Sequence, residues 1–168
     1  MEVLNNYSEP WKVTLVDTGL NTMTGGRVRR IRPYVGEEPF MLTYGDGVST
    51  VDLNALLAFH KSHGRIATIT TVSLAQTKGV LDIDENNTVL SFREKDDSDK
   101  ALINGGFMIM NPGIFDYLEG DTTVFEQKPM QQLAAEGQLK SFYHDGFWQC
   151  MDTQREMKKL EELWQSGK

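Results

Sequence analysis

Cysteine is almost absent from this sequence, whose single thiol belongs to Cys150. One cysteine cannot form an intramolecular disulfide, and it gives no metal-binding spacing. Such scarcity fits the reducing cytoplasm, where disulfides are rare. Long apolar runs are missing as well, since stretches such as 55–59 are far too short to span a bilayer. The first residues have neither the basic nor the apolar region of a signal peptide, so we expect a cytoplasmic protein.

Positive charge is in the minority, with 17 basic against 24 acidic residues and a formal net charge of -7. A nucleic-acid backbone would be repelled by this balance unless a basic patch opposed it. The densest group of arginines lies between residues 27 and 32 and is equally typical of one solvated helix face. We therefore expect neither nucleic acid nor a membrane among the partners.

Two glycine-rich phosphate-binding patterns are also missing. Neither G-x-x-x-x-G-K-[ST] nor G-x-G-x-x-G occurs in the sequence. No internal repeat, low-complexity tract or linker-like run interrupts the 168 residues, a length that suits one domain with a sizeable core. We therefore expect residues 1–168 to form a single domain of ordinary globular composition.

Hydrophobic patterning predicts strands and helices that alternate along the chain. The run at 40–44 is almost continuously apolar, which is typical of a strand buried on both faces. Runs at 80–83 and 89–92 flank a short loop and predict an antiparallel hairpin. Further strands are predicted where short apolar runs are bounded by turn residues, namely at 11–16, 66–72, 102–110, 139–143 and 147–149.

Capping residues mark the expected helix boundaries. Helices are expected to begin near Thr24 and Ser49, and Gly64 ends the second of them. Two later helices begin with capping boxes, Thr123 with Glu126 and Thr153 with Glu156. The last helix is expected to pack a core face made of Met157, Leu160, Leu163 and Trp164. This alternation favours an α/β fold with a mostly parallel, Rossmann-like sheet and an antiparallel excursion at 79–95.

Two carboxylates are the main candidates for chemistry. Asp46 follows the strand at 40–44 and lies between two glycines, and ligands gather at the carboxyl ends of parallel strands. An aspartate there is well placed to bind a divalent cation, although a turn residue without a ligand has the same signature. Asp152 directly precedes the helix-capping Thr153, where a carboxylate is normally explained by the helix dipole alone.

Three further segments carry residues of interest, and each has a structural alternative. Lys95, next to Glu94, suits a phosphate contact or a surface ion pair. The Asn104-Gly105-Gly106 run suits a β-bulge or a close approach of the backbone to a ligand. The Thr24-Gly25-Gly26-Arg27 run suits an anion-binding helix start or a helix entry turn.

The order of these motifs is more specific than any one of them. The succession is Val16–Gly19, Thr22–Arg27, Thr43–Val48, Phe92–Lys95, Ile103–Phe107 and Phe147–Thr153. It resembles the sugar-1-phosphate nucleotidyltransferase family over about residues 10–167, and within it the glucose-1-phosphate cytidylyltransferase branch. The Gly-Asp-Gly, Glu-Lys and Asn-Gly-Gly-Phe motifs are shared across the family. The segments at 17–27 and 147–153 resemble the cytidylyl branch.

The resemblance implies a function and a role for each motif. Family members of this branch join CTP and glucose 1-phosphate to form CDP-glucose and release pyrophosphate, with Mg²⁺ bridging the phosphates. Asp46 and Asp152 match the two Mg²⁺-binding aspartates, and Lys95 matches the lysine that contacts the sugar phosphate. These three are the implied catalytic residues. The implied substrate-binding residues are Gly25, Gly26, Arg27, Tyr44, Gly45, Glu94, Asn104 and Gly105.

The sequence departs from the family pattern in two places. The family begins with an apolar strand and a Gly-Gly-x-Gly-Thr-Arg loop that cradles the triphosphate, and no such segment precedes Tyr7. Asp96 and Asp97 follow Lys95 where the family usually has proline, and their charge would oppose phosphate binding. We therefore expect this chain, which corresponds to the C-terminal two-thirds of a family member, to be inactive alone. The alternative is a non-catalytic remnant that keeps the fold and acts by binding.

The missing N-terminal strands also predict assembly. Without them, the strand at 40–44 or a neighbour has an unpaired edge, and Leu53, Leu56 and Leu57 lose their cover. Unpaired strand edges and apolar patches favour association, so we expect a homo-oligomer with a two-fold contact. The alternative is a monomer in which residues 1–10 fold across the gap.

Overall fold

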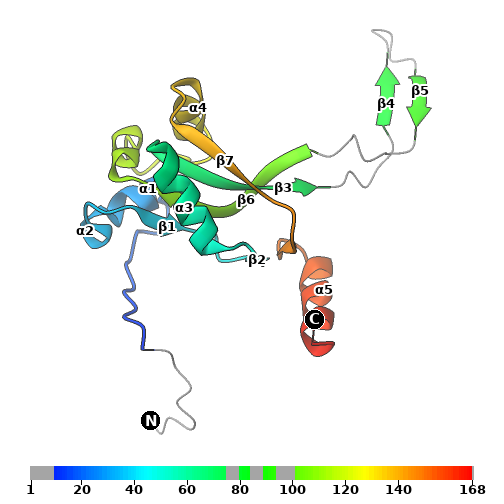
Figure 1. The fold of residues 1–168 in the computed structure, drawn as a ribbon, viewed down its shortest axis with the longest axis horizontal. Helices are drawn as coiled ribbons and strands as arrows, with labels where there is room; N and C mark the ends of the chain where they lie inside the picture. The colour runs from blue at the N-terminus through cyan, green and yellow to red at the C-terminus, as the bar shows by residue number, and fades with distance from the viewer. Residues whose placement is uncertain (1–9, 75–79, 84–88, 94–100, 168) are drawn as a thin grey trace, which may run out of the picture.

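A four-stranded mixed sheet forms the centre of the protein in a computed structural model, which describes residues 10–74, 80–83, 89–93 and 101–167. Across the sheet the order is β1 (Phe40–Leu42), β6 (Ala101–Met110), β3 (Ala67–Leu74) and β7 (Leu139–His144) (Figure 1). β6 is antiparallel to β1 and β3, whereas β3 and β7 are parallel. β1, β3 and β7 therefore share one direction. The expected α/β fold is confirmed, with β6 running against the other three strands.

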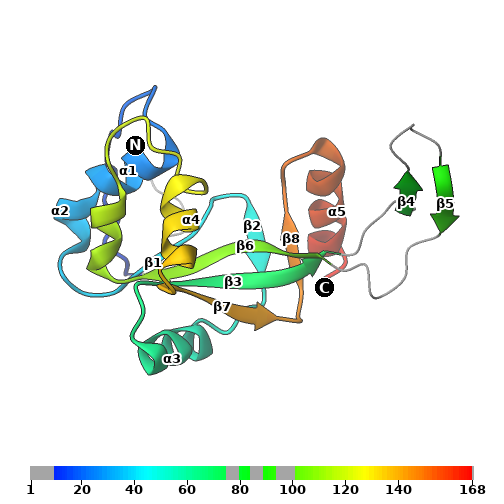
Figure 2. The same cartoon turned by 90° about the horizontal axis from the view of Figure 1, so that it is seen from above.

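Helices cover both faces of this sheet (Figure 2). α3 (Leu53–His63) lies on one face, and α1 (Thr24–Arg30) and α4 (Lys128–Ala135) lie on the other. Two short helices, α2 (Arg32–Val35) and the 3₁₀ helix η2 (Pro112–Tyr117), complete that second layer. The core between the sheet and this second layer is apolar and inaccessible to solvent. The side chains of Met108, Met110, Phe125 and Leu133 are at most 1% exposed.

α3 ends at the predicted residue, Gly64, but its N-cap differs from the predicted one. The carboxylate of Asp52 accepts hydrogen bonds from the backbone N–H groups of Asn54 and Ala55, so the N-cap is Asp52 and not Ser49. Gly64 ends the helix in the left-handed region, with φ 61°. Leu56 is buried on this helix, so the expectation that it loses its cover is wrong.

The starts of α1 and α4 differ from the prediction because tertiary contacts take their capping side chains. Thr24 is the first residue of α1 and not its cap, and its hydroxyl donates to Glu126. α4 has Gln127 at its N-cap without a side-chain hydrogen bond. The predicted capping box is therefore wrong: Thr123 accepts a hydrogen bond from the Gly120 N–H instead.

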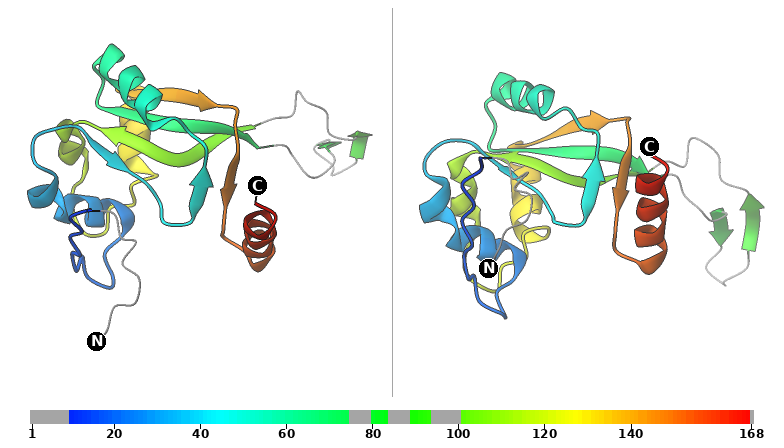
Figure 3. Two further views of the ribbon diagram at one scale, coloured as in Figure 1. Left: turned by 60° about the horizontal axis from the view of Figure 1, so that its bottom comes forward. Right: turned by 90° about the horizontal axis from the view of Figure 1, so that it is seen from below.

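The predicted strand at 11–16 does not form. Residues 11–19 contain neither strand nor helix, and Figure 3 shows them as a trace outside the sheet. Within the described parts of the chain no strand pairs with this segment, so its side chains stay in solvent: Trp11 is 77% exposed and Leu15 is 92% exposed. β-propensity alone does not make a strand, because its backbone groups need a partner.

Two smaller ladders lie outside the central sheet. β2 (Gly47–Ser49) pairs with β8 (Trp148–Cys150) in antiparallel register, with Gly47 opposite Cys150. β4 (Val80–Ile83) and β5 (Val89–Arg93) form the antiparallel hairpin that the sequence predicts. β1 is an edge strand of its sheet and Met41 is 49% exposed, so burial of this strand on both faces is not observed.

α5 (Gln154–Gln165) has the predicted cap but not the predicted environment. Thr153 and Glu156 form a full capping box. However, α5 has no buried residue, and Trp164 is 82% exposed. Its apolar face, expected in the core, lines an open groove together with Val48, Phe147 and Met151. In the described ranges, no helix combines the length and the apolar character that crossing a bilayer requires.

Candidate functional site

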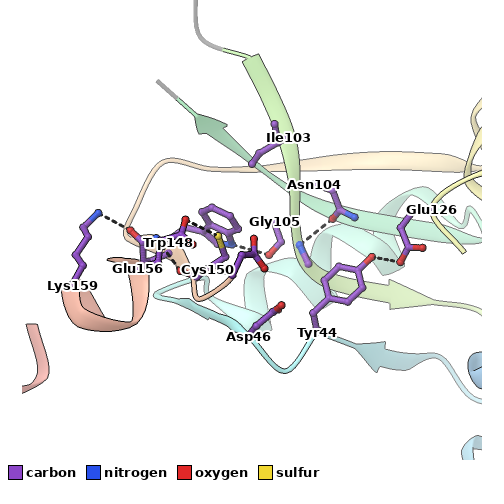
Figure 4. Close-up of a pocket in the computed structure, with 13 residues that line it drawn as sticks. Tyr44, Asp46, Ile103, Asn104, Gly105, Glu126, Trp148, Cys150, Glu156 and Lys159 are labelled. Carbon is purple, nitrogen blue, oxygen red and sulfur yellow. Dashed lines mark hydrogen bonds between the residues drawn. The ribbon is translucent and has the colours of Figure 1, made fainter. Parts of the chain in front are cut away.

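An open pocket of about 750 Å³ lies where β1, β6, β8 and the start of α5 approach one another (Figure 4). Four separate parts of the chain contribute: the turn after β1, the middle of β6, the loop before α4, and the β8–α5 junction. The lining residues are Tyr44, Asp46, Ile103, Asn104, Gly105, Gly106, Glu126, Trp148, Gln149, Cys150, Asp152, Glu156 and Lys159.

Asp46 and Asp152 line this pocket together, although 106 positions separate them in the sequence. Asp46 lies in the turn between β1 and β2, and Asp152 lies between β8 and α5. The β2–β8 ladder joins the two segments, and the N–H of Met151 extends it by donating to the carbonyl of Asp46 at 2.9 Å. Two carboxylates that line one pocket offer oxygen donors of the kind that a hard divalent cation prefers.

Asn104, Gly105 and Gly106 form a bulge in β6. The register with β3 shifts at this point, between Ile69 and Thr71. Gly106 has φ +83°, and its N–H donates to Oδ1 of Asn104 at 2.9 Å. This bond uses the amide oxygen of Asn104 and leaves its amide nitrogen as a donor. The sequence left two interpretations of Gly105 and Gly106, a β-bulge or a close approach of the backbone to a ligand, and the structure shows the β-bulge.

Neighbouring side chains fit closely against this bulge. The indole Nε1 of Trp148 donates to the carbonyl of Gly105 at 2.8 Å. A Cβ added at Gly106 would lie 2.8 Å from Cδ2 of the Tyr44 ring, and one at Gly105 would lie 3.2 Å from the Thr70 carbonyl. Larger residues therefore do not fit at either position.

Glu126 closes one end of the pocket through two hydrogen bonds. Its Oε1 accepts from the hydroxyl of Tyr44 at 2.7 Å, and its Oε2 accepts from the hydroxyl of Thr24 at 2.7 Å. The hydroxyl of Thr24 in turn accepts from the N–H of Phe125 at 2.9 Å. Burial, followed by the Glu126 carboxylate, raises the pKa of the Tyr44 phenol well above its usual range. Tyr44 is therefore a neutral donor at physiological pH.

A thiol and two carboxylates cluster at the β8–α5 junction. The ligand atoms of Cys150, Asp152 and Glu156 lie within 4.8 Å of one another. Burial and the two neighbouring carboxylates raise the pKa of the Cys150 thiol to about 11, so the sulfur keeps its proton and donates to Glu156. A protonated thiol is a poor metal ligand. Of the three groups, the two carboxylates are the ligands that a hard cation such as Mg²⁺ prefers.

Several residues expected at the site lie elsewhere. Gly25 and Gly26 pack against residues 121–123, where the N–H of Gly25 donates to the Thr123 carbonyl at 2.9 Å. Arg27 donates to the Thr18 hydroxyl at 2.7 Å and to the Leu20 carbonyl, and it does not line the pocket. Gly45 lies in the turn beside Asp46 but is not a lining residue. Glu94 and Lys95 are outside the described residues.

Glu126, Trp148 and Lys159 are among the lining residues to which the sequence assigns no role at the site. Glu126 was interpreted as half of a capping box, and Trp148 was given no role within its motif. Lys159 lies in the pocket, where its ammonium donates to Oε1 of the mostly buried Gln149 at 2.6 Å. Glu156 and Lys159 lie three residues apart in α5, a spacing that places both on one helix face, and Asp152 lies just before the N-cap of that helix.

Several known proteins are similar to this chain in sequence or in fold. Residues 21–155 match the family model described as nucleotidyl transferase. The glucose-1-phosphate cytidylyltransferase of Salmonella typhi is 49% identical over 169 residues, which cover all of this chain and 65% of that protein. The probable glucose-1-phosphate cytidylyltransferase of Bacillus subtilis is 39% identical, over 95% of this chain and 62% of that protein. This chain therefore spans somewhat less than two thirds of the length of these curated relatives.

The solved structures support the fold. HddC from Yersinia pseudotuberculosis superposes with a TM-score of 0.63 at 22% identity, covering 86% of this chain and 64% of that chain. A putative glucose-1-phosphate thymidylyltransferase from Bacillus anthracis gives the same TM-score at 14% identity. At such identities the likeness concerns the fold, and it confirms the nucleotidyltransferase type of α/β sheet.

Proposed function

Since this chain belongs to the nucleotidyl transferase family, we propose that its pocket serves the transfer of a cytidylyl group from CTP to glucose 1-phosphate. Relatives at 49% and 39% identity are a glucose-1-phosphate cytidylyltransferase and a probable one. The observation that carries the proposal is that Asp46 and Asp152 line one pocket together with the Asn104–Gly106 bulge.

In this reaction an oxygen of the sugar phosphate bonds to the α-phosphorus of CTP, and the bond from that phosphorus to pyrophosphate breaks. The attacking oxygen is already an anion, so no general base is required, and the protein contributes position and charge neutralisation. Asp46 and Asp152 would hold Mg²⁺. When bound, this ion neutralises phosphate charge and polarises the phosphorus. The resemblance assigns Lys95 to the sugar phosphate.

The charges of the lining residues explain why cations must be recruited. The lining includes the carboxylates of Asp46, Glu126, Asp152 and Glu156, and Lys159 is its one cation among the described residues. Phosphate groups would be repelled by this wall unless a divalent ion covered it. The polar groups facing the pocket, among them the Asn104 amide and the Tyr44–Glu126 pair, suit the hydroxyl groups of a sugar.

We propose further that catalysis needs the part of the family fold that this chain does not span, whether that part belongs to a longer protein or to another chain. The relatives are longer by about a third of their length. An edge strand, the exposed residues at 11–15 and the uncovered face of α5 also support a homo-oligomer. A non-catalytic binding protein with the same pocket is the alternative.

Two measurements on the chain test the proposal. Pyrophosphate release from CTP, glucose 1-phosphate and Mg²⁺ should stay at background, because losing one preorganised donor already costs on the order of a hundredfold. Turnover at about 1 s⁻¹, an ordinary enzymatic rate, would contradict the proposed incompleteness. Mn²⁺ as a probe for Mg²⁺ should bind the wild-type chain and bind Asp46→Asn and Asp152→Asn at least about tenfold more weakly. Equal affinity in all three proteins would contradict the proposed site.

A further inference from the structure

Glu126 connects two parts of the chain that are far apart in sequence. It lies 82 positions from Tyr44 and 102 from Thr24, and it accepts a 2.7 Å hydrogen bond from each. Bonds of this length from a hydroxyl to a carboxylate are charge-assisted and stronger than neutral ones. One side chain therefore ties the start of α1 to the end of β1.

The connection continues from Tyr44 to the turn that carries Asp46. Tyr44 is half-buried, its ring lies against Gly106, and its hydroxyl is held by Glu126. Held at both ring and hydroxyl, Tyr44 has little freedom. Asp46 follows two residues later, and its own side chain has no protein hydrogen bond among those found in the described residues. Its position therefore depends on the backbone on each side, which is fixed by Tyr44 before it and by the Met151 N–H after it.

We propose that Glu126 is a positioning residue of the site: by holding Tyr44 it sets where the Asp46 carboxylate lies relative to Asp152. This inference rests on the proposed divalent-cation role of the two aspartates. It also gives the Thr24–Arg27 segment a link to the pocket. That segment does not line the pocket itself, but Thr24 shares the carboxylate that holds Tyr44.

A positioning role and a merely structural role of Glu126 predict different effects of its substitution on cation affinity and on stability. Glu126 is exposed, and polar contacts of exposed side chains contribute little to global stability. Outer residues that orient metal ligands, by contrast, typically change metal affinity about 10- to 100-fold. A positioning role therefore predicts a large change in cation affinity with a small change in the unfolding temperature.

The test compares Glu126→Ala, Glu126→Gln and Tyr44→Phe with a matched control, Glu136→Ala. Glu136 also accepts a hydrogen bond from a tyrosine hydroxyl, that of Tyr117, but it lies outside the pocket. Mn²⁺ affinity is measured by electron paramagnetic resonance on the full chain. Glu126→Ala and Tyr44→Phe should each weaken Mn²⁺ binding about tenfold, and Glu126→Gln should weaken it less. Glu136→Ala should leave it unchanged.

Amide hydrogen exchange without metal gives a second, independent measurement. Glu126→Ala should speed exchange in residues 43–48, and Glu136→Ala should not. If wild-type protein fails to bind Mn²⁺, the proposed function fails, and exchange still decides whether Glu126 orders the Asp46 turn. If wild type binds Mn²⁺ but Glu126→Ala binds within twofold of it, or if exchange in 43–48 is unchanged, the positioning role is wrong.

Discussion

The ring of Tyr44 occupies the space into which any side chain at position 106 would extend. A Cβ on Gly106 would lie 2.8 Å from Cδ2 of that ring, and the backbone of Gly106 has φ +83°. The contact joins the end of β1 to the bulge of β6. Two separate requirements, a left-handed backbone and an empty Cβ position, therefore select glycine here.

Gly106→Ala should lower the free energy of unfolding by about 2 to 4 kcal/mol, because it adds steric overlap to backbone strain. Gly137→Ala is the matched control: Gly137 has φ +66° and no atom within 4 Å of the added Cβ. It should cost only the backbone strain, about 1 kcal/mol. Urea unfolding of both variants gives the comparison, and equal losses would show that the Tyr44 contact adds nothing.

Gly26→Ala should be destabilising, although alanine normally stabilises a helix interior by about 1 kcal/mol relative to glycine. Gly26 lies in α1, and its new Cβ would lie 2.7 Å from both the Cα and the carbonyl oxygen of Asp121. Backbone atoms cannot move aside cheaply, so we expect a loss of about 1 to 3 kcal/mol. Gly120→Ala, with nothing within 4 Å, is the control in the same unfolding measurement. Stabilisation by Gly26→Ala would contradict the packing of α1 against residues 121–123.

The two capping-box patterns show what local sequence can and cannot predict. Thr153 and Glu156 form the predicted box because no distant group competes for them. Thr123 and Glu126 have the same spacing, yet Glu126 bonds to Tyr44 and Thr24. Those partners come from sequence positions that a local pattern does not include. The same limit applies to the predicted strand at 11–16, which depends on a partner strand and not on its own propensity.

The fold topology bears on the arrangement of the site in a way that local signals do not. Strand ends on one sheet edge implied that Asp46 and Asp152 approach each other, and they line one pocket. The roles of Glu126 and Lys159 could not be inferred, since the first depends on tertiary hydrogen bonds and the second on where α5 lies. The sequence predicts that the apolar face of α5 lies in the core. In the structure no residue of α5 is buried, because the apolar spacing of a helix does not tell whether another element packs against it.

Loss of the α5 cap should have a local effect. The hydroxyl of Thr153 accepts from the N–H of Glu156 at 3.2 Å, and removing such a cap costs about 1 kcal/mol. Since no residue of α5 is buried, Thr153→Ala should speed amide exchange in residues 154–158 about fivefold and barely change global unfolding. Thr153→Ser keeps the hydroxyl and should behave as wild type. A large fall in the unfolding temperature of Thr153→Ala would mean that α5 is part of the cooperative core.

His63 should make stability depend on pH. Its Nδ1 accepts the N–H of Arg65 at 3.0 Å, so the neutral ring carries its proton on Nε2, which lies 2.8 Å from the Thr68 hydroxyl. Burial lowers the pKa of His63, and the nearby His60, Lys140 and Arg65 lower it further. The unfolded chain then binds more protons, so the free energy of unfolding should fall as pH drops below about 6.5.

Urea unfolding between pH 5 and 7.5 checks this dependence against His63→Asn, whose side-chain oxygen can still accept from Arg65. The difference between wild type and variant isolates the histidine from the carboxylates that titrate in both proteins. We expect wild type to lose stability relative to His63→Asn as the pH falls. A difference that stays constant across the range would rule out His63 as the cause.

The β2–β8 ladder has a consequence for the order of folding. It pairs Gly47 with Cys150, 103 positions away, and closing such a long loop is slow compared with forming local contacts. Asp46 and Asp152 therefore come to line one pocket only after β8 has paired with β2. When synthesis has reached residue 140, β1, β3 and β6 of the central sheet exist, but the lining residues from Trp148 to Lys159 have yet to be added.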